Sequence, residues 1–189
     1  MGKGILRAAE PMGGVERVVL GHAHPDHRGG ARRLRAPIFC HRAERPDVEG
    51  GGGLRYFDYS KLDTRAAQVQ MRAAMRLADC GPLMVAGELR EGDVVAGFRV
   101  IELPGHSPGQ IGLWRERDRL ALTSDCFYTL HSESPGEPEL PRAAYTLDER
   151  RARESVLKLA ALEPAAAWPG HAEPVTGRVR EKLEAAAGS

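Results

Sequence analysis

The stretch that decides the fold is "VVLGHAHPDHRGG", Val18 to Gly30. It places three of the seven histidines and one aspartate within six residues, directly after an apolar run. Alternate side chains of an extended segment point to the same side, so His22 and His24 can meet at one point while Asp26 and His27 turn toward a second. Imidazole and carboxylate groups are good ligands for zinc, iron or manganese. The stretch therefore predicts metal binding, with one segment serving two ions.

Three further candidate ligands each follow an apolar run and stand beside glycine or a small residue. They are His106 in "LPGH", Asp125 in "LTSD" and His171 in "WPGH". Proline and glycine before a ligand hold a turn tight and let the backbone approach closely. A single histidine in such a turn is more often an ordinary turn or capping residue, but the recurrence of this context favours a metal site. His41 and His131 lie outside the pattern, and we expect neither to be a ligand.

Taken in order, "HAHPDH", "LPGHSPGQIGLW", "TSDCFY" and "WPGH" resemble the metal motifs of the metallo-β-lactamase-fold hydrolase superfamily, from Val15 to about His171. The resemblance implies an αβ/βα sandwich that holds two metal ions. It implies His22, His24 and His106 as ligands of the first metal, Asp26, His27 and His171 as ligands of the second, and Asp125 as the bridge. Zinc is the expected metal, with iron or manganese as alternatives, because this nitrogen and oxygen donor set suits several first-row ions.

Such a site predicts hydrolysis by a metal-bound hydroxide, because a coordinated water has its pKa lowered toward about 7. Asp26 or Asp125 can orient this nucleophile or pass a proton to the leaving group. Tyr128, three residues after Asp125, resembles the arrangement of the acyl-homoserine lactonase branch, which implies a hydrogen bond to the carbonyl oxygen as charge develops. A core tyrosine with a satisfied hydroxyl is an equal alternative. We expect a lactone or an ester as the small-molecule substrate.

Three alternative functions stay open. Thioesterases of the glyoxalase II type generally hold a substrate carboxylate with basic side chains after the bridging position, but no lysine lies between Asp125 and Lys158, although Arg142 could serve. An iron-dependent oxidoreductase of the same fold and a metal-binding protein without turnover are the other two. The segment Tyr56 to Met75 could line an apolar acyl pocket, but amphipathic core packing is the preferred interpretation.

Apolar spacing and turn residues predict an α/β chain that forms one domain, residues 1–189. Strands are expected at Val15–Leu20, Ala36–His41, Val94–Leu103, Ile111–Trp114 and Leu120–Thr123. Helices are expected within His27–Ala36, at Asp63–Asp79, from a Thr146 to Glu149 capping box to just before Pro164, and within Val175–Ala187. The glycine-rich and aromatic segment from Glu44 to Leu62 is expected to be a mobile surface loop.

Members of the superfamily begin with several strands before the histidine motif, whereas only 21 residues precede His22 here. We therefore expect a sandwich truncated at its amino terminus, with an open sheet edge. A misassigned start codon and a homo-oligomer in which another copy completes the sheet are the alternatives.

The composition limits the classes of partner that we expect for this protein. A formal net charge of +1 provides no basic field for a phosphate backbone, so nucleic acid is not expected. No apolar run approaches the roughly 20 residues of a membrane span, and the start lacks a secretion signal. The three dispersed cysteines form no disulfide framework, and Cys126 is interpreted as a small buried apolar residue. We expect a cytoplasmic protein without membrane partners.

Overall fold

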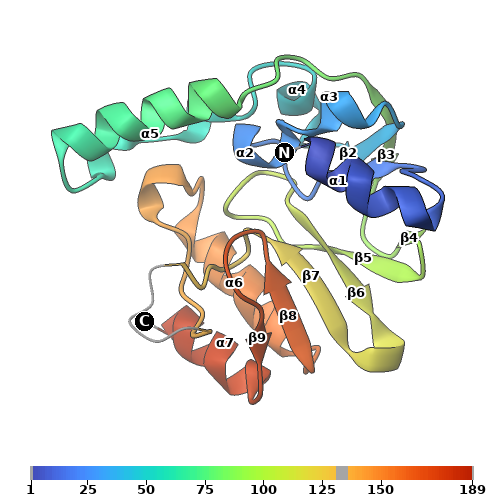
Figure 1. Ribbon diagram of the computed structural model, residues 1–189. Coiled ribbons are helices and arrows are strands. Elements are labelled where there is room, and N and C mark those ends of the chain that lie inside the picture. The colour runs from blue at the N-terminus through green and yellow to red at the C-terminus, as the bar shows by residue number, and fades with distance from the viewer. Residues whose placement is uncertain (1, 131–135, 189) are drawn as a thin grey trace.

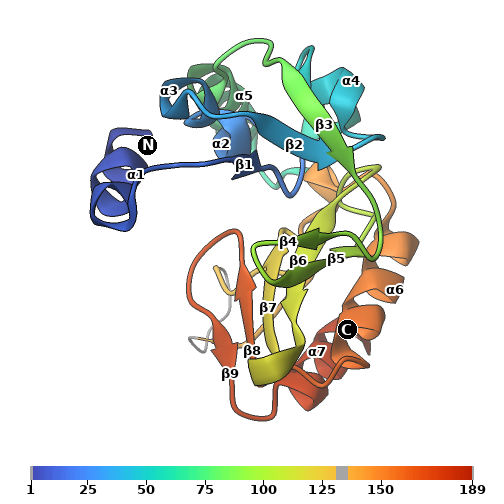
Figure 2. The same cartoon turned by 90° about the vertical axis from the view of Figure 1, so that its right-hand side faces the viewer.

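The computed structural model describes residues 2–130 and 136–188, which form two β-sheets with helices on their outer sides (Figure 1, Figure 2). Its first sheet holds the parallel strands β1 (Val18–Val19), β2 (Ile38–His41) and β3 (Val85–Leu89). Its second sheet holds, in chain order, β4 (Val94–Val95), β5 (Phe98–Glu102), β6 (Ile111–Arg115), β7 (Leu120–Ser124), β8 (Ala166–Pro169) and β9 (Val175–Thr176). The expected α/β fold class is confirmed.

The two sheets meet through apolar side chains that alternate with others facing the helices. Phe39 of β2, Val100 of β5 and Ile111 of β6 belong to the cluster between the sheets. Their neighbours Cys40 and Ile101 belong to the clusters on the outer sides. Successive side chains of a strand point to opposite faces, so each sheet contributes to two apolar layers.

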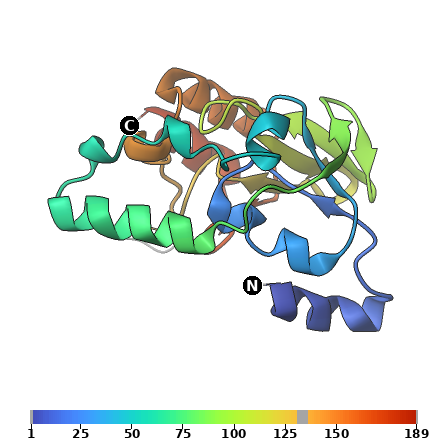
Figure 3. The same cartoon turned by 90° about the horizontal axis from the view of Figure 1, so that it is seen from above.

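Helices cover both outer faces of the sandwich. They are α2 (Pro25–Arg28), α3 (Ala31–Leu34) and α4 (Arg45–Val48) on the first sheet, and α6 (Glu149–Ala160) and α7 (Val179–Gly188) on the second. Leu159 of α6 and Leu183 of α7 are fully buried against the second sheet. The first helix, α1 (Gly2–Ala9), lies beside α3 and apart from the sheets (Figure 3).

Helix α5 (Arg65–Ala78) extends away from the two sheets (Figure 1). It begins after Thr64, whose hydroxyl accepts a hydrogen bond from Ala67 N and so satisfies one free amide of the first turn. The helix expected at Asp63–Asp79 is confirmed, but the preferred interpretation that it packs into the core is wrong. None of its residues is buried.

Other expected elements differ in their bounds. The strand expected at Val15–Leu20 is shorter in the structure, where β1 consists of two residues. The run Val94–Leu103 is two antiparallel strands, because Ala96 and Gly97 both take positive φ angles, 51° and 78°, and reverse the chain between β4 and β5. The helix expected within His27–Ala36 is the short pair α2 and α3. Strands β3, β8 and β9 and helix α1 were not expected, and the helix expected within Val175–Ala187 begins only at Val179.

Two expectations about local structure are wrong. Helix α6 is capped by Asp148, whose carboxylate accepts from Arg151 N, and not by Thr146, whose hydroxyl donates to the carbonyl of Pro141. The segment Glu44–Leu62 is not a surface loop throughout. It contains α4, and Glu44, Asp47 and Val48 are buried. Val48 belongs to the apolar cluster on the outer side of the first sheet.

The edges of the first sheet are β1 and β3 among the described residues. Within the described part of the chain, strand β1 pairs with β2 alone, so the expected open edge is present. In the part of the chain that the structure describes, no helix combines the length and apolar character needed to cross a membrane.

Candidate metal centre

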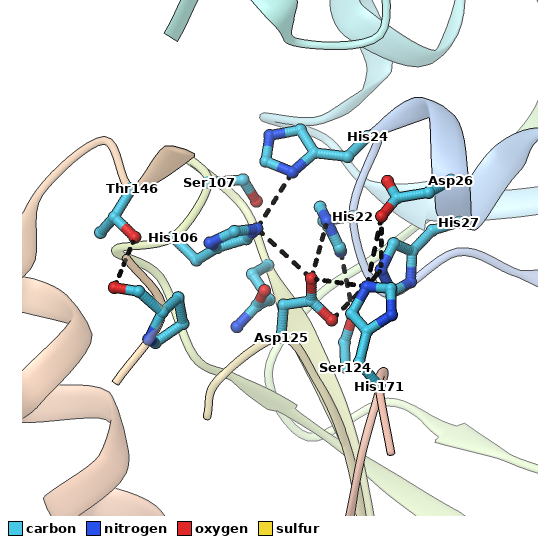
Figure 4. A network of polar contacts seen from close by, with 12 residues as sticks. His22, His24, Asp26, His27, His106, Ser107, Ser124, Asp125, Thr146 and His171 are labelled. Atoms are coloured by element: carbon cyan, nitrogen blue, oxygen red, sulfur yellow. Dashed lines mark hydrogen bonds and ion pairs between the residues drawn. The ribbon is translucent and has the colours of Figure 1, made fainter. Parts of the chain in front are cut away.

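The candidate ligands come together because each follows the end of a strand at the same side of the sandwich. His22 follows β1, and His106 follows β5. Asp125 and His171 follow β7 and β8, which are parallel neighbours and therefore end at the same edge of the sheet. Asp26 is on the single turn of α2 and faces the same point (Figure 4).

The first cluster consists of three buried imidazoles. The ligand atoms of His22, His24 and His106 lie within 4.8 Å of one another. His106 Nε2 is 3.0 Å from His24 Nδ1. All three rings are at most 2% exposed, so protein surrounds this cluster on nearly every side.

The second cluster is more open. His27 Nε2 lies 3.1 Å from His171 Nε2, and His171 Nε2 lies 3.2 Å from Asp26 Oδ2. These three side chains are half-buried. Solvent and small molecules can therefore approach this cluster more readily than the first.

Asp125 lies between the two clusters (Figure 4). Its Oδ1 is 3.1 Å from His27 Nε2, and its Oδ2 is 3.6 Å from His106 Nε2 and 3.5 Å from His171 Nε2. The structure thus brings together all seven side chains singled out in the sequence. His41 stays apart, with its Nε2 3.1 Å from Glu102 Oε1, and His131 lies outside the described residues.

The donor atoms fit divalent cations. In both close imidazole pairs two ring nitrogens face each other, an arrangement that neutral rings tolerate only with one proton between them or with a shared electrophile. His22 Nε2 is buried and has no hydrogen-bond partner among the described residues. A buried nitrogen without a partner costs free energy, and a cation that accepts its lone pair removes this cost. Nitrogen and carboxylate donors suit zinc, iron or manganese.

The electrostatics of the two clusters differ. Burial lowers the pKa of His22 and His24 well below the ordinary value, and lowers the pKa of His106 to about 4, so these rings are neutral at pH 7. Hydrogen bonds to Asp125 and Asp26 instead raise the pKa of His171 to about 10. The first cluster is thus ready to coordinate a cation, whereas His171 must first lose a proton.

Glycines let the ligand loops approach one another. A Cβ at Gly170, directly before His171, would lie 2.1 Å from Asp125 Oδ1 and 2.5 Å from His27 Cε1. Gly105, directly before His106, has a φ of 135°, and a Cβ there would lie 2.2 Å from the backbone nitrogen of Ala152 in the first turn of α6. The expected close approach at the two "PGH" turns is confirmed.

Sequence reasoning missed Glu44, which joins two ligand loops. This buried carboxylate accepts hydrogen bonds from Ala23 N at 2.8 Å, from Ser107 Oγ at 2.7 Å and from Gly109 N at 2.7 Å. Ala23 stands between His22 and His24, and Ser107 follows His106. A lone acidic residue after a strand carries no sequence signal for this role, because its partners are distant in the chain.

Tyr128 also reaches the centre. Its hydroxyl donates to Asp125 Oδ2 at 3.2 Å, and only 5% of the residue is exposed. Burial and the Asp125 carboxylate hold the pKa of Tyr128 well above its usual range, so the phenol stays protonated and can donate. Cys126 is a buried free thiol, as expected.

A cavity of about 400 Å³ opens over the centre. One wall carries His24, Asp26, His106, Asp125, Tyr128 and His171. The rest of the lining forms a mostly apolar wall from α5 and nearby loops, with Phe57, Leu62, Ala67, Met71, Ala74, Met75 and Leu130. The expectation that the segment Tyr56 to Met75 packs into the core is therefore wrong, because residues of this segment line the cavity.

The sequence matches the family model described as the metallo-beta-lactamase superfamily over residues 7–171. The probable metallo-hydrolase YflN of Bacillus subtilis (strain 168) is 29% identical over 187 residues, with 87% of this chain and 67% of YflN covered. The chain spans 56–70% of the length of the curated relatives that it matches.

Solved structures are also similar to this chain. The crystal structure of TTHA1623 in a di-iron-bound form matches with a TM-score of 0.65 and 27% identity, covering 92% of this chain and 79% of that one. A metallo-beta-lactamase from Pontibacter korlensis matches with a TM-score of 0.64 at 12% identity, covering 99% of this chain and 76% of that one. The second likeness concerns the fold alone.

Proposed function

Since this chain belongs to the metallo-beta-lactamase superfamily, we propose that it is a metal-dependent hydrolase that cleaves a lactone or an ester with two divalent cations, preferably zinc. The observation that carries the proposal is the position of Asp125 between two histidine clusters, at the floor of a cavity with an apolar wall. The curated relatives are named as probable metallo-hydrolases, which supports the reaction class.

In this proposal each cluster holds one cation. His22, His24 and His106 hold the first, and Asp26, His27 and His171 hold the second. Asp125 contacts both clusters through its two oxygens and is the shared ligand. When bound, the cations supply a water of lowered pKa and polarise the substrate carbonyl.

Residues around the cations provide proton transfer and orientation. Asp26 is half-buried and lines the cavity, so it can receive a proton from the nucleophile and return it to the leaving alkoxide. The Tyr128 phenol lines the same wall and can turn its donor from Asp125 to the substrate carbonyl oxygen. A donor aimed at the oxygen on which charge develops stabilises the transition state.

The apolar wall supports a substrate with an apolar substituent. Met71 and Met75 of α5 and Phe57 face the cavity, and the Phe57 ring contacts the ring of His24 at 4.7 Å between centroids. Arg142 is the arginine among the described lining residues, and its Nη1 lies 3.5 Å from the Asp63 carboxylate. Because Asp63 offsets the positive charge of Arg142, a neutral acyl group is favoured over a thioester substrate that carries a carboxylate.

A second candidate is an iron-dependent oxidoreductase. The observation that favours it is that TTHA1623, a structural neighbour at 27% identity, is described in a di-iron-bound form. Reconstitution of metal-free protein with zinc or iron separates the two candidates. Hydrolysis with zinc supports the first, and iron-dependent oxygen uptake without hydrolysis supports the second.

A substrate panel tests the proposal. Zinc-reconstituted protein is assayed with lactones and esters whose acyl chains increase in length, alongside thioesters. We expect turnover of lactones or esters in the wild type and its loss in Asp125→Asn, while Asp118→Asn, an exposed aspartate far from the centre, keeps full activity. Metal-loaded wild type that turns over none of these substrates would contradict the proposal.

A further inference from the structure

We propose that Ser124 is a positioning residue whose hydroxyl accepts a hydrogen bond from Nδ1–H of His22 and so leaves Nε2 free to bind a cation. The inference rests on the metal site of the proposed function but concerns a residue outside the ligand set. Ser124 Oγ lies 2.9 Å from His22 Nδ1, and Ser124 immediately precedes Asp125. It is therefore in contact with one ligand and covalently attached to another.

The backbone at Ser124 is strained. This last residue of β7 has a φ of 50°, in the left-handed region where a side chain crowds the backbone and where glycine is the least costly residue. Its carbonyl accepts a hydrogen bond from Gly170 N at 2.7 Å, beside His171. Strain of this kind persists where the surrounding structure imposes it, and it gathers at functional sites. At Ser124 the strained residue carries a hydroxyl that contacts the ring of His22.

The effect of this contact follows from the two nitrogens of His22. When Nδ1–H donates to Ser124 Oγ, the proton is held on Nδ1 and Nε2 keeps its lone pair. His22 Nε2 is buried, has no hydrogen-bond partner among the described residues and lies 3.9 Å from Asp125 Oδ2. The free nitrogen thus faces the other ligands. Partners of this kind orient metal-binding histidines and change the affinity for the metal.

Gly21 gives independent evidence that the fold makes room for the contact between Ser124 and His22. A Cβ at Gly21 would lie 2.6 Å from both Cβ and Oγ of Ser124, while its next neighbour, Ile111 O, would be 3.3 Å away. The serine side chain therefore occupies the space that a residue larger than glycine before His22 would need. The two positions fit each other, and substitutions at them should be coupled.

The first test compares Ser124→Gly and Ser124→Ala with the wild type. Zinc affinity is measured on metal-free protein by competition with a chromogenic chelator, and thermal unfolding is followed without metal. We expect both variants to bind the first zinc equivalent at least about 10-fold more weakly. Ser124→Gly should nevertheless unfold about 2–4 °C above Ser124→Ala, because glycine relieves the strain.

Arg119 provides the matched control. It is exposed, has a φ of 52° and lies in the turn between β6 and β7, far from the centre. Arg119→Gly relieves the same kind of strain and should leave zinc affinity unchanged. If Ser124→Gly binds zinc as tightly as the wild type, the hydroxyl has no positioning role and the inference is overturned. Wild-type protein that binds no metal would instead refute the proposed function.

The second test uses the coupling with Gly21. Gly21→Ala alone should lower both the unfolding temperature and zinc affinity, because its methyl group collides with Ser124. Adding Ser124→Gly should restore the unfolding temperature but not the affinity, since the hydroxyl is still missing. Additive effects on the unfolding temperature would show that the two residues do not share this space and would overturn the inference.

Discussion

Asp125 Oδ1 lies 3.1 Å from His27 Nε2, although Asp125 follows strand β7 of the second sheet and His27 stands on helix α2 above the first. The contact joins the two halves of the sandwich at one point. Asp125 is 2% exposed, and although burial alone raises its pKa, His27 and His171 hold it well below the usual range. An ionised, buried carboxylate between imidazoles is the arrangement that a cation pair needs.

Replacing Glu44 should disturb the centre without touching a ligand. Glu44→Gln keeps one acceptor oxygen but turns an amide NH₂ toward at least one of its three donors. We expect the free energy of unfolding to fall by about 1–3 kcal/mol and metal affinity by about 10-fold or more. Glu49→Gln, an exposed partner of Arg45, is the control. Chemical denaturation and chelator competition measure both quantities, and wild-type values in Glu44→Gln would contradict the role.

Metal binding should release protons. His171 has a pKa of about 10 in metal-free protein, so it carries a proton at pH 8, whereas His106, with a pKa of about 4, does not. A cation binds the unprotonated nitrogen, so metal affinity should rise as the pH rises from 7 toward 10. Calorimetry in two buffers of different ionisation enthalpy should detect about one proton or more released per chain. Asp26→Asn should reduce this release, and binding without proton release would contradict the assignment of His171.

The phenol of Tyr128 should act in turnover and not in metal binding. Tyr128→Phe removes the donor while the ring keeps its buried position. We expect kcat for lactones or esters to fall about 100-fold, with metal content unchanged. Steady-state kinetics with elemental analysis of the same sample measures both. Unchanged kcat would leave Tyr128 a packing residue, the alternative raised by its sequence position.

The methionines of α5 should determine chain-length preference. Met71→Ala and Met75→Ala shorten the apolar wall, so kcat/KM for a long-chain ester should fall about 10-fold relative to an acetate ester. The unfolding temperature should stay the same, because no residue of α5 is buried. Val69→Ala, on the exposed side of the helix, should change neither quantity. An equal effect on short and long chains would contradict the assignment of this wall.

The sequence contained enough to predict which side chains gather at the centre. The dense histidine motif and the three similar turns before His106, Asp125 and His171 indicated the cluster. The glycines of the "PGH" turns indicated a close approach of the backbone, and Gly105 and Gly170 show this approach in the structure. These signals are local, because each depends on a few adjacent residues. Strands with clear β-branched runs, such as β6 and β7, were also predicted nearly to their bounds.

Features that depend on distant contacts were not predictable. Amphipathic spacing in α5 shows that one face is apolar, but it does not show whether that face meets a core or a cavity. Glu44 and Ser124 carry no motif, since their partners lie 21 to 102 residues away in the chain. The cap at Asp148 was missed because Thr146 offered a competing capping box, and its hydroxyl is instead used by the carbonyl of Pro141.

The central claim is that the seven side chains form a centre for two metal ions. Its most direct test is elemental analysis of metal per chain on reconstituted, folded wild type and on Asp125→Asn, with Asp118→Asn as the control. We expect about two ions per chain in the wild type and the control, and fewer in Asp125→Asn because both clusters lose their shared ligand. Folded wild type without stoichiometric metal after reconstitution would contradict the claim.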